Sequence, residues 1–307
     1  MMPRMRIVDR ALVAALPTVP RTVVRRFAER YMAGEKLEDA VRVVRDLNGR
    51  GMRATIDVLG EFIRRPAEAE KMAAEYERVL ACIADEGLEA SVSIKLSALG
   101  MEIDPALARR HVEHLLDVAA GHDIFVRIDM EHSGLTEATL ALYRELRAAG
   151  RDGVGIVLQS YLRRSLADVR SLAELRPNVR LVKGIYIEPR AIAFRDMEIV
   201  NRNFVRLLEE LLERGSYVAV ATHDERLVWE ALDQLDRRGV GPDGYEFQML
   251  LGVDPELRDI LVRDGHPMRI YVPYGNAWYG YSMRRLKENP SIAGYIAKDV
   301  AAQITPG

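Results

Sequence analysis

Short apolar runs rich in β-branched residues alternate with longer amphipathic stretches from about residue 50 onward. The runs have the length of strands and are mostly apolar on both faces, which is typical of buried parallel strands. We expect strands at residues 54–60, 90–97, 123–130, 153–160, 179–186, 217–223, 245–250 and 268–274. Eight strands alternating with helices predict a closed parallel barrel or a doubly wound sheet. No GxGxxG motif follows the first strand, and eight is the barrel number, so we expect a distorted (β/α)8 TIM-type barrel.

Helix boundaries are marked by local signals. Asp104-Pro105 and Asp254-Pro255 each place a capping carboxylate before a proline at the first helical position. A basic last turn followed by glycine, Arg214-Gly215, predicts a helix end. Apolar residues recur at helical spacing between Leu37 and Leu47. We therefore expect a helical segment over residues 1–50 and one barrel domain over residues 51–307.

Charge and composition exclude several classes of protein. The 307 residues carry 44 Lys and Arg against 46 Asp and Glu, a formal net charge of -2, which argues against a nucleic-acid binder. The single cysteine and the absence of an HExxH motif give no reason to expect a metal. No apolar run approaches the ~20 residues of a membrane-spanning helix, and the start lacks the pattern of a secretory signal. We expect a cytoplasmic protein whose basic N-terminal helices leave a peripheral membrane contact open.

Polar residues recur near the carboxyl ends of the predicted strands, where barrel enzymes carry their active sites. They include Lys95, Asp129, Gln159, Lys183, Thr222 and His223. Several have an alternative interpretation: Lys95 could be a structural partner of a carboxylate such as Asp129 in a lower layer, and His223 a buried structural histidine. Arg180, at the start of the fifth strand, could be a surface residue. Their number favours a ligand site, because burying so many polar groups without a ligand is costly.

A further candidate site follows the last strand. If the chain is helical from about Trp278, then Tyr281, Arg284, Arg285 and Glu288 share one helix face. Paired guanidinium groups favour a small carboxylate ligand, and tyrosines supply flat walls for a small ring. A solvated basic turn is the alternative from spacing alone.

Several segments together resemble the proline dehydrogenase family, in particular its short bacterial members that carry only this domain. They are SIKLSALG, RIDMEHS, VLQSYLRR, RLVKGIY, ATHDE, YEFQMLLG, RIYVPYG and YGYSMRRLKEN, in the family's order. The resemblance implies FAD over the strand ends and active-site positions at Asp129 and Arg180. It implies flavin contacts at Met130, Gln159, Lys183, Gly184, Ile185, Thr222 and His223, although Ile185 stands where the family has alanine. It implies proline-binding positions at Lys95, Arg284 and Arg285, lined by Leu250, Tyr271, Tyr281 and Glu288.

By the same resemblance, L-proline is oxidised to 1-pyrroline-5-carboxylate and a membrane quinone reoxidises the flavin. We hypothesise that Lys95 and Asp129 form a hydrogen-bonded pair, that Arg180 tunes the flavin, and that Lys183 and Gly184 approach its pyrophosphate. Two alternatives stay open from the residues alone. One is a lyase or aldolase with Lys95 or Lys183 as a Schiff base, and the other is a non-catalytic barrel that senses an amino acid. The oligomeric state is not predicted.

Overall fold

The computed structural model describes residue 25 and residues 28–60, 63–280 and 282–283. Eight parallel strands close into a barrel in the order β1 to β8, with β8 pairing with β1. They are β1 (Arg53–Val58), β2 (Ala90–Ile94), β3 (Val126–Ile128), β4 (Val154–Gln159), β5 (Asn178–Val182), β6 (Tyr217–Ala221), β7 (Tyr245–Leu250) and β8 (Met268–Tyr274). The expected (β/α)8 architecture is therefore confirmed.

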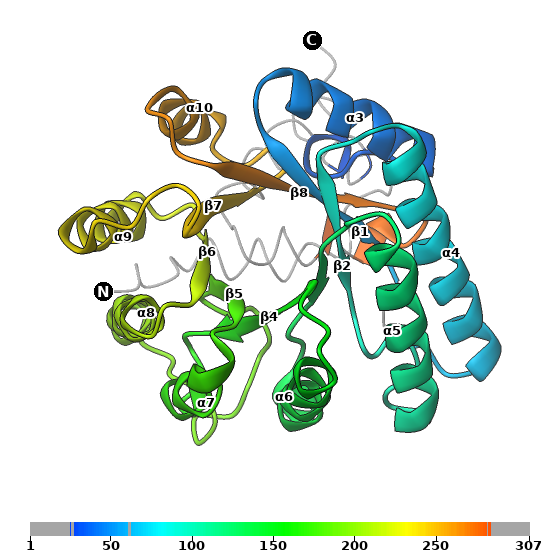
Figure 1. The fold of residues 1–307 in the computed structure, drawn as a ribbon, viewed down its shortest axis with the longest axis horizontal. Coiled ribbons are helices and arrows are strands. Elements are labelled where there is room, and N and C mark those ends of the chain that lie inside the picture. Colours follow the sequence, from blue (N-terminus) through cyan, green and yellow to red (C-terminus); the bar gives the residue numbers. More distant parts are fainter. Residues whose placement is uncertain (1–24, 26–27, 61–62, 281, 284–307) are drawn as a thin grey trace, which may run out of the picture.

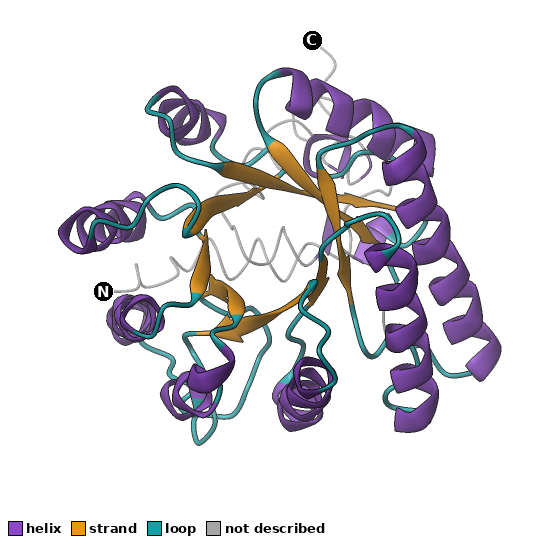
Figure 2. Ribbon diagram, viewed as in Figure 1, coloured by secondary structure: helices purple, strands orange, loops and turns teal. Residues whose placement is uncertain are grey.

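Helices surround the barrel, as Figure 2 shows. They are α3 (Leu37–Gly49), α4 (Pro66–Asp85), α5 (Pro105–Ala120), α6 (Ser133–Ala148), α7 (Ser165–Ser171), the short 3-10 helix η2 (Ala173–Leu175), α8 (Met197–Glu213), α9 (Glu225–Arg238) and α10 (Pro255–Arg263). Helix α3 lies in the ring between α10 and α4 and packs against β1 and β8 (Figure 1). It falls inside the segment 1–50 predicted to be helical, most of which lies outside the described residues.

The predicted caps are formed. The Asp104 carboxylate accepts a hydrogen bond from the backbone N–H of Ala106, and that of Asp254 accepts one from Leu257. Helix α8 ends before Gly215, whose φ of 70° is a conformation that glycine adopts readily. These local signals fix where helices begin and end, and hence where each strand emerges.

Two details of the strand prediction are wrong. Strands β1 to β6 all end before the predicted ends, because the chain turns at their carboxyl ends; the N–H of Leu99, for example, bonds to the carbonyl of Lys95. The strands are also less apolar than predicted. Outward residues such as Ile56 and Val92 pack in the core against the helices, whereas alternate residues such as Asp57 and Ser93 are buried and polar.

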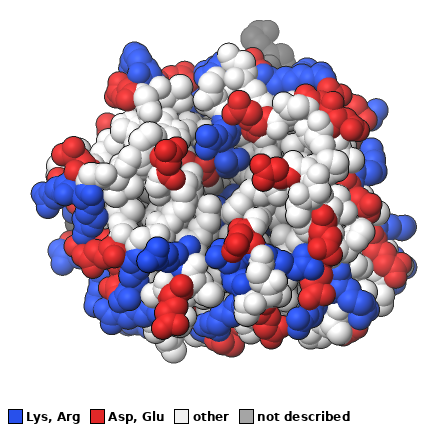
Figure 3. All heavy atoms as spheres, viewed as in Figure 1, with Lys and Arg blue, Asp and Glu red and all other residues white. Residues whose placement is uncertain are grey.

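The outer surface carries both charges. Figure 3 shows acidic and basic side chains interspersed over one face of the molecule. Among the described residues, no helix is long and apolar enough to cross a membrane.

Candidate active site

Asp129 is the centre of a cluster of polar side chains from four strands. Its Oδ1 accepts a hydrogen bond from Arg180 Nη1 at 2.7 Å, and its Oδ2 accepts one from the Tyr271 hydroxyl at 2.9 Å. Lys95 Nζ lies 3.5 Å from the same Oδ2 and donates to the Tyr271 hydroxyl at 3.3 Å. Lys95 and Asp129 directly follow β2 and β3, whereas Arg180 and Tyr271 lie within β5 and β8. Four residues predicted from the sequence thus meet inside the barrel.

Lys95 has a second carboxylate partner that sequence reasoning missed. Its Nζ donates to Oδ1 of Asp57, a residue of β1 that is 1% exposed. The hypothesised pair with Asp129 is present as an ion pair, but the hydrogen bond of Lys95 to a carboxylate goes to Asp57. Asp57, Lys95, Asp129 and Arg180 carry two negative and two positive charges, so this buried group is neutral overall.

Arg180 is fixed on several sides. Its Nε donates to Gln248 Oε1 at 2.5 Å, and its Nη1 also donates to Ser93 Oγ at 3.0 Å. The guanidinium carbon lies 5.2 Å from the centroid of the Tyr271 ring, a distance typical of cation–π contacts. Arg180 is buried, so the alternative that it is a surface residue is wrong.

These contacts hold each group in its neutral-pH protonation state. Burial by itself lowers the pKa of Lys95, but Asp57, Tyr271 and Asp129 outweigh it and raise the pKa well above its ordinary value. Burial would raise the pKa of Asp129, yet Arg180 and Lys95 lower it overall. Burial, with the carboxylates of Asp129 and Asp57, raises the pKa of Tyr271 well above 10. At neutral pH the cluster therefore contains an ammonium, a carboxylate and a neutral phenol.

A second group of predicted residues follows β5 and β6. Lys183 Nζ donates to Asp224 Oδ2 at 2.6 Å, while Oδ1 of Asp224 caps α9 by accepting from the N–H of Arg226. His223 Nε2 accepts a hydrogen bond from the backbone N–H of Leu250 at 2.9 Å, so β6 and β7 are joined at their ends. Thr222 Oγ1 accepts from the N–H of Asp224 at 3.1 Å.

Gln159 has a feature that fits a bound group, whereas Gly184 is explained by the packing of the protein itself. Gln159 Nε2 donates to the carbonyls of Met130 and Glu131 at 3.3 and 3.4 Å, but its buried Oε1 accepts no hydrogen bond from the described residues. Gly184 has a φ of 106°, and a Cβ there would collide with the Tyr161 ring. Ile185, next to it, is exposed.

The predicted arginine helix is described only at its start. Residues 278–280 and 282–283 are helical, as predicted from Trp278 onward. The four predicted substrate contacts on this helix, Tyr281, Arg284, Arg285 and Glu288, lie outside the described residues.

Comparison with known proteins agrees with these motifs. A sequence model described as proline dehydrogenase matches residues 40–298. Proline dehydrogenase 1 of Bacillus subtilis is 38% identical over 89% of this chain and 90% of its own, and proline dehydrogenase of Deinococcus radiodurans is 38% identical over 88% and 89%. The chain belongs to the proline dehydrogenase family.

The barrel of this family member also resembles solved structures. Proline utilization A from Bdellovibrio bacteriovorus, inactivated by N-propargylglycine, superposes with a TM-score of 0.83 at 23% identity over 91% of this chain and 36% of its own, a likeness of fold. The curated bifunctional protein PutA of Escherichia coli is 29% identical over 89% of this chain but only 24% of its own length. The chain therefore corresponds in extent to the short, monofunctional members.

Three residues that bond to the polar cluster were not predicted as site residues: Asp57, Ser93 and Gln248. Each lies within a strand between two apolar residues that point to the opposite face, and this alternation of polar and apolar residues was the available signal. Among the described residues, no group of three or more His, Cys, Asp or Glu side chains is placed to hold a metal ion.

Proposed function

We propose that the chain is an FAD-dependent enzyme that oxidises L-proline to 1-pyrroline-5-carboxylate and passes the electrons to a quinone. The family assignment carries this proposal, since the relatives that match nearly end to end are named proline dehydrogenases. The buried cluster around Asp129, at the carboxyl ends of the strands, supports it, because barrel enzymes place their active sites there.

The reaction removes a hydride from the ring carbon beside the nitrogen and a proton from the nitrogen. Bound FAD supplies a two-electron acceptor for that hydride. The residues that would hold FAD are Met130, Gln159, Lys183, Gly184, Ile185, Thr222 and His223. Gln159 fits such a role because its buried Oε1 lacks a donor among the described residues. Position 184 is a glycine for the protein's own packing, because a Cβ there would strike the Tyr161 ring.

Substrate binding would divide between two parts of the chain. Arg284 and Arg285 would bind the proline carboxylate through paired hydrogen bonds, with Tyr281 and Glu288 beside them. Lys95, Tyr271 and Leu250 would line the opposite side, because they lie at or near the carboxyl ends of β2, β8 and β7. Such positioning contributes to the rate by orienting the ring before reaction.

The Asp129 cluster would act by position and charge rather than by exchanging protons. An efficient general acid or base has a pKa near the operating pH. Lys95 and Tyr271 are shifted further above that range and Asp129 further below it. The cluster would therefore keep a constant charge through turnover, and Arg180, held by Asp129 and Gln248, would present a fixed guanidinium to the bound flavin.

The Schiff-base alternative is disfavoured by the same contacts. A lysine nucleophile must be a neutral amine, and enzymes achieve this by lowering its pKa. Lys95 instead has two carboxylates within ion-pairing distance and a raised pKa. Lys183 is likewise paired with Asp224.

An anaerobic visible spectrum, recorded before and after addition of L-proline, tests the proposal. We expect a flavin spectrum that bleaches with proline and recovers when a soluble quinone is added. Arg284→Ala should retain the flavin and lose the bleaching at proline concentrations that reduce the wild type. A colourless protein that takes up no added FAD would refute the cofactor, and a flavin that stays oxidised with proline would refute the substrate.

The proposed location is the cytoplasm, with a transient contact at the membrane surface where quinones reside. Flotation with vesicles of anionic phospholipid tests that contact. Protein that remains in the dense fraction under reducing conditions with proline would refute it.

A further inference from the structure

A cavity of about 210 Å³ lies at the amino-terminal ends of the strands, on the far side of Arg180 from Asp129. Its volume is about seven times the ~30 Å³ that a water molecule occupies in the liquid. It is lined by Arg53, Thr55, Ser91, Phe125, Arg127, Asn178, Arg180, Tyr217, Glu246, Gln248 and Arg269. None of these except Arg180 was predicted as a site residue. The cavity is therefore separate from the candidate active site but shares one guanidinium with it.

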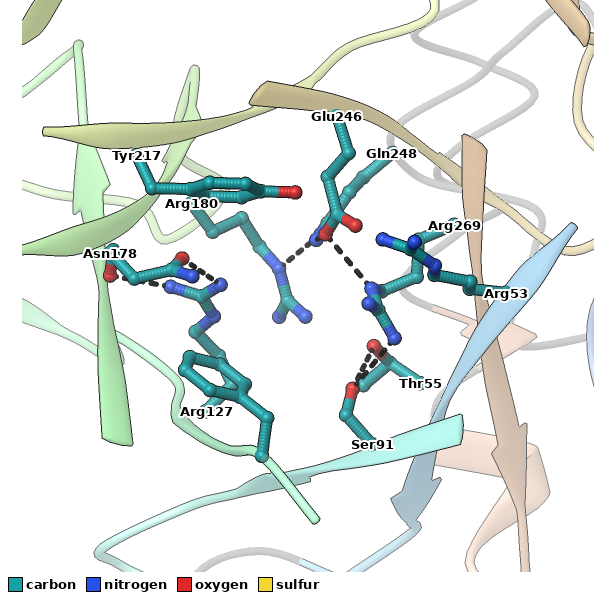
Figure 4. A pocket seen from close by; sticks show the side chains of 11 residues that line it. Arg53, Thr55, Ser91, Arg127, Asn178, Arg180, Tyr217, Glu246, Gln248 and Arg269 are labelled. Carbon is teal, nitrogen blue, oxygen red and sulfur yellow. Dashed lines mark hydrogen bonds and ion pairs between the residues drawn. The ribbon is translucent and has the colours of Figure 1, made fainter. Parts of the chain in front are cut away.

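Basic groups dominate the lining. Figure 4 shows the guanidinium groups of Arg127, Arg180 and Arg269 pointing toward the same space from β3, β5 and β8. Two of them have carboxylate partners: Arg180 pairs with Asp129 at 2.7 Å and Arg269 with Glu246 at 2.8 Å. A fourth arginine, Arg53, is exposed at the start of β1 and places positive charge at the rim.

Arg127 has no carboxylate partner among the described residues, although it is only 2% exposed. Its Nη1 donates to the carbonyls of Ile156 and Asn178 at 3.1 and 2.7 Å, and its Nη2 donates to Asn178 Oδ1 at 2.6 Å. These neutral acceptors orient the guanidinium but do not balance its charge. Burial and the neighbouring Arg180 lower the pKa of Arg127 to about 9; Glu246 opposes this shift, and Arg269 adds a smaller contribution to it. A buried charge without a counter-charge is costly, so the site favours an anion.

Two buried atoms with opposite hydrogen-bonding needs lie among these groups. Within the described part of the chain, Arg127 Nε has no acceptor and Glu246 Oε2 has no donor in hydrogen-bonding geometry, and the Tyr217 hydroxyl lies beside the Glu246 carboxylate (Figure 4). Gly155 leaves room for the Arg127 guanidinium itself, because a Cβ there would lie 2.5 Å from Arg127 Nη1 and 2.7 Å from the carbonyl oxygen of Asn178. The hydroxyls of Ser91 and Thr55 bond to one another at 2.9 Å, and Ser91 also accepts from Arg269 at 3.2 Å.

We propose that this cavity binds a protonated tetrahedral oxyanion, such as hydrogen phosphate, between Arg127, Arg269 and Glu246. The oxyanion supplies acceptor oxygens to the arginines and a negative charge to the unbalanced Arg127. Its hydroxyl donates to Oε2 of Glu246. This inference stands independently of the proposed function.

Glu246 sets the choice of anion. A buried carboxylate demands a proton donor and repels an oxygen that has none. Hydrogen phosphate has a hydroxyl at neutral pH, whereas sulfate and chloride have no proton to donate. The site should therefore discriminate between phosphate and sulfate even though the two ions are close in size and shape.

Calorimetric titration of the purified protein with inorganic phosphate tests the proposal, at pH 7 and constant ionic strength set with chloride. We expect one phosphate per chain and roughly tenfold to hundredfold weaker binding of sulfate. Arg127→Met should abolish the binding. Arg237→Met serves as the matched control, because Arg237 is 71% exposed on α9 and forms its ion pair with Asp233, so this variant should bind phosphate as the wild type does.

Glu246→Gln provides a result that general damage to the fold would not produce. The amide can donate where the carboxylate only accepts, so sulfate affinity should rise at least tenfold while phosphate loses its advantage. This variant and the wild type decide the question even if Arg127→Met fails to fold. The proposal is overturned if the wild type shows no saturable phosphate binding, if phosphate and sulfate bind equally well to it, or if Glu246→Gln leaves the ratio unchanged.

Discussion

Asp57→Asn tests whether the neutral charge balance of the buried cluster stabilises the fold. The substitution keeps the size of the side chain but leaves Lys95 and Arg180 against a single carboxylate, Asp129, so one positive charge is unbalanced. Asp57 and Lys95 are 1% and 7% exposed, so water compensates little. Removing one partner of a buried pair costs ~3–5 kcal/mol, and we expect a loss of that size in the free energy of unfolding.

Lys95→Met should cost a similar amount, because it leaves Asp57 and Asp129 against Arg180 alone. The double variant Asp57→Asn/Lys95→Met restores a neutral cluster, so its loss should be well below the sum of the two single losses, with a coupling energy of about 3 kcal/mol. The free energies come from urea unfolding followed by circular dichroism.

Asp233→Asn is the matched control for this cycle. Asp233 pairs at 3.0 Å with Arg237, which is 71% exposed, and breaking such a surface pair costs under ~1 kcal/mol. The reasoning fails if Asp57→Asn lies within about 1 kcal/mol of the wild type, or if the double variant loses as much as the two single variants together.

Three further predictions follow from the site. Tyr271→Phe removes the hydroxyl that donates to Asp129 at 2.9 Å, and should lower the free energy of unfolding by ~1–3 kcal/mol in the same urea assay; no change would contradict the bond. The lowered pKa of Asp129 means that its stabilisation is present above about pH 4, the pKa of an unfolded aspartate, and is lost as pH falls through the folded value. Asp129→Asn should therefore flatten the loss of stability on acidification between pH 5 and pH 2, measured as urea midpoints, and an unchanged slope would refute this. Gly184→Ala should lower the melting temperature more than Gly215→Ala, because both have positive φ but only Gly184 faces a ring that a Cβ would strike; equal losses would show that backbone strain alone matters.

The barrel could be predicted from the sequence because its signals are local. The capping carboxylates of Asp104 and Asp254 and the glycine after Arg214 report on single helix ends, and each was placed as predicted. The count of eight apolar runs then fixed the architecture. Strand ends were less predictable, since the polar residues that follow β2 and β5 leave the sheet through turns that the apolar pattern does not mark.

The partners inside the barrel were harder to predict than its members. Lys95, Asp129, Arg180 and Tyr271 were identified through their resemblance to family motifs, which places residues but does not pair them. Asp57 is the hydrogen-bonded carboxylate of Lys95; it lies in β1, whereas Lys95 directly follows β2, 38 positions away in the sequence. Such a pairing depends on the register of β1 against β2, where Asp57 lies beside Ser93.

The cavity at the amino-terminal ends of the strands was not predicted, for a further reason. Arg127, Glu246 and Arg269 lie near the amino ends of their strands, where barrel enzymes do not carry their active sites, and each is flanked by apolar neighbours that face the helices. In the sequence each looks like an isolated charge at the edge of a strand. Closure of the barrel brings them together, and the resulting excess of positive charge beside Arg180 is a property of the assembled interior. Such a site becomes visible only when each buried charge in the folded barrel is matched with its partner. Arg180 and Arg269 then have carboxylate partners, and Arg127 is the cation that a bound anion would neutralise.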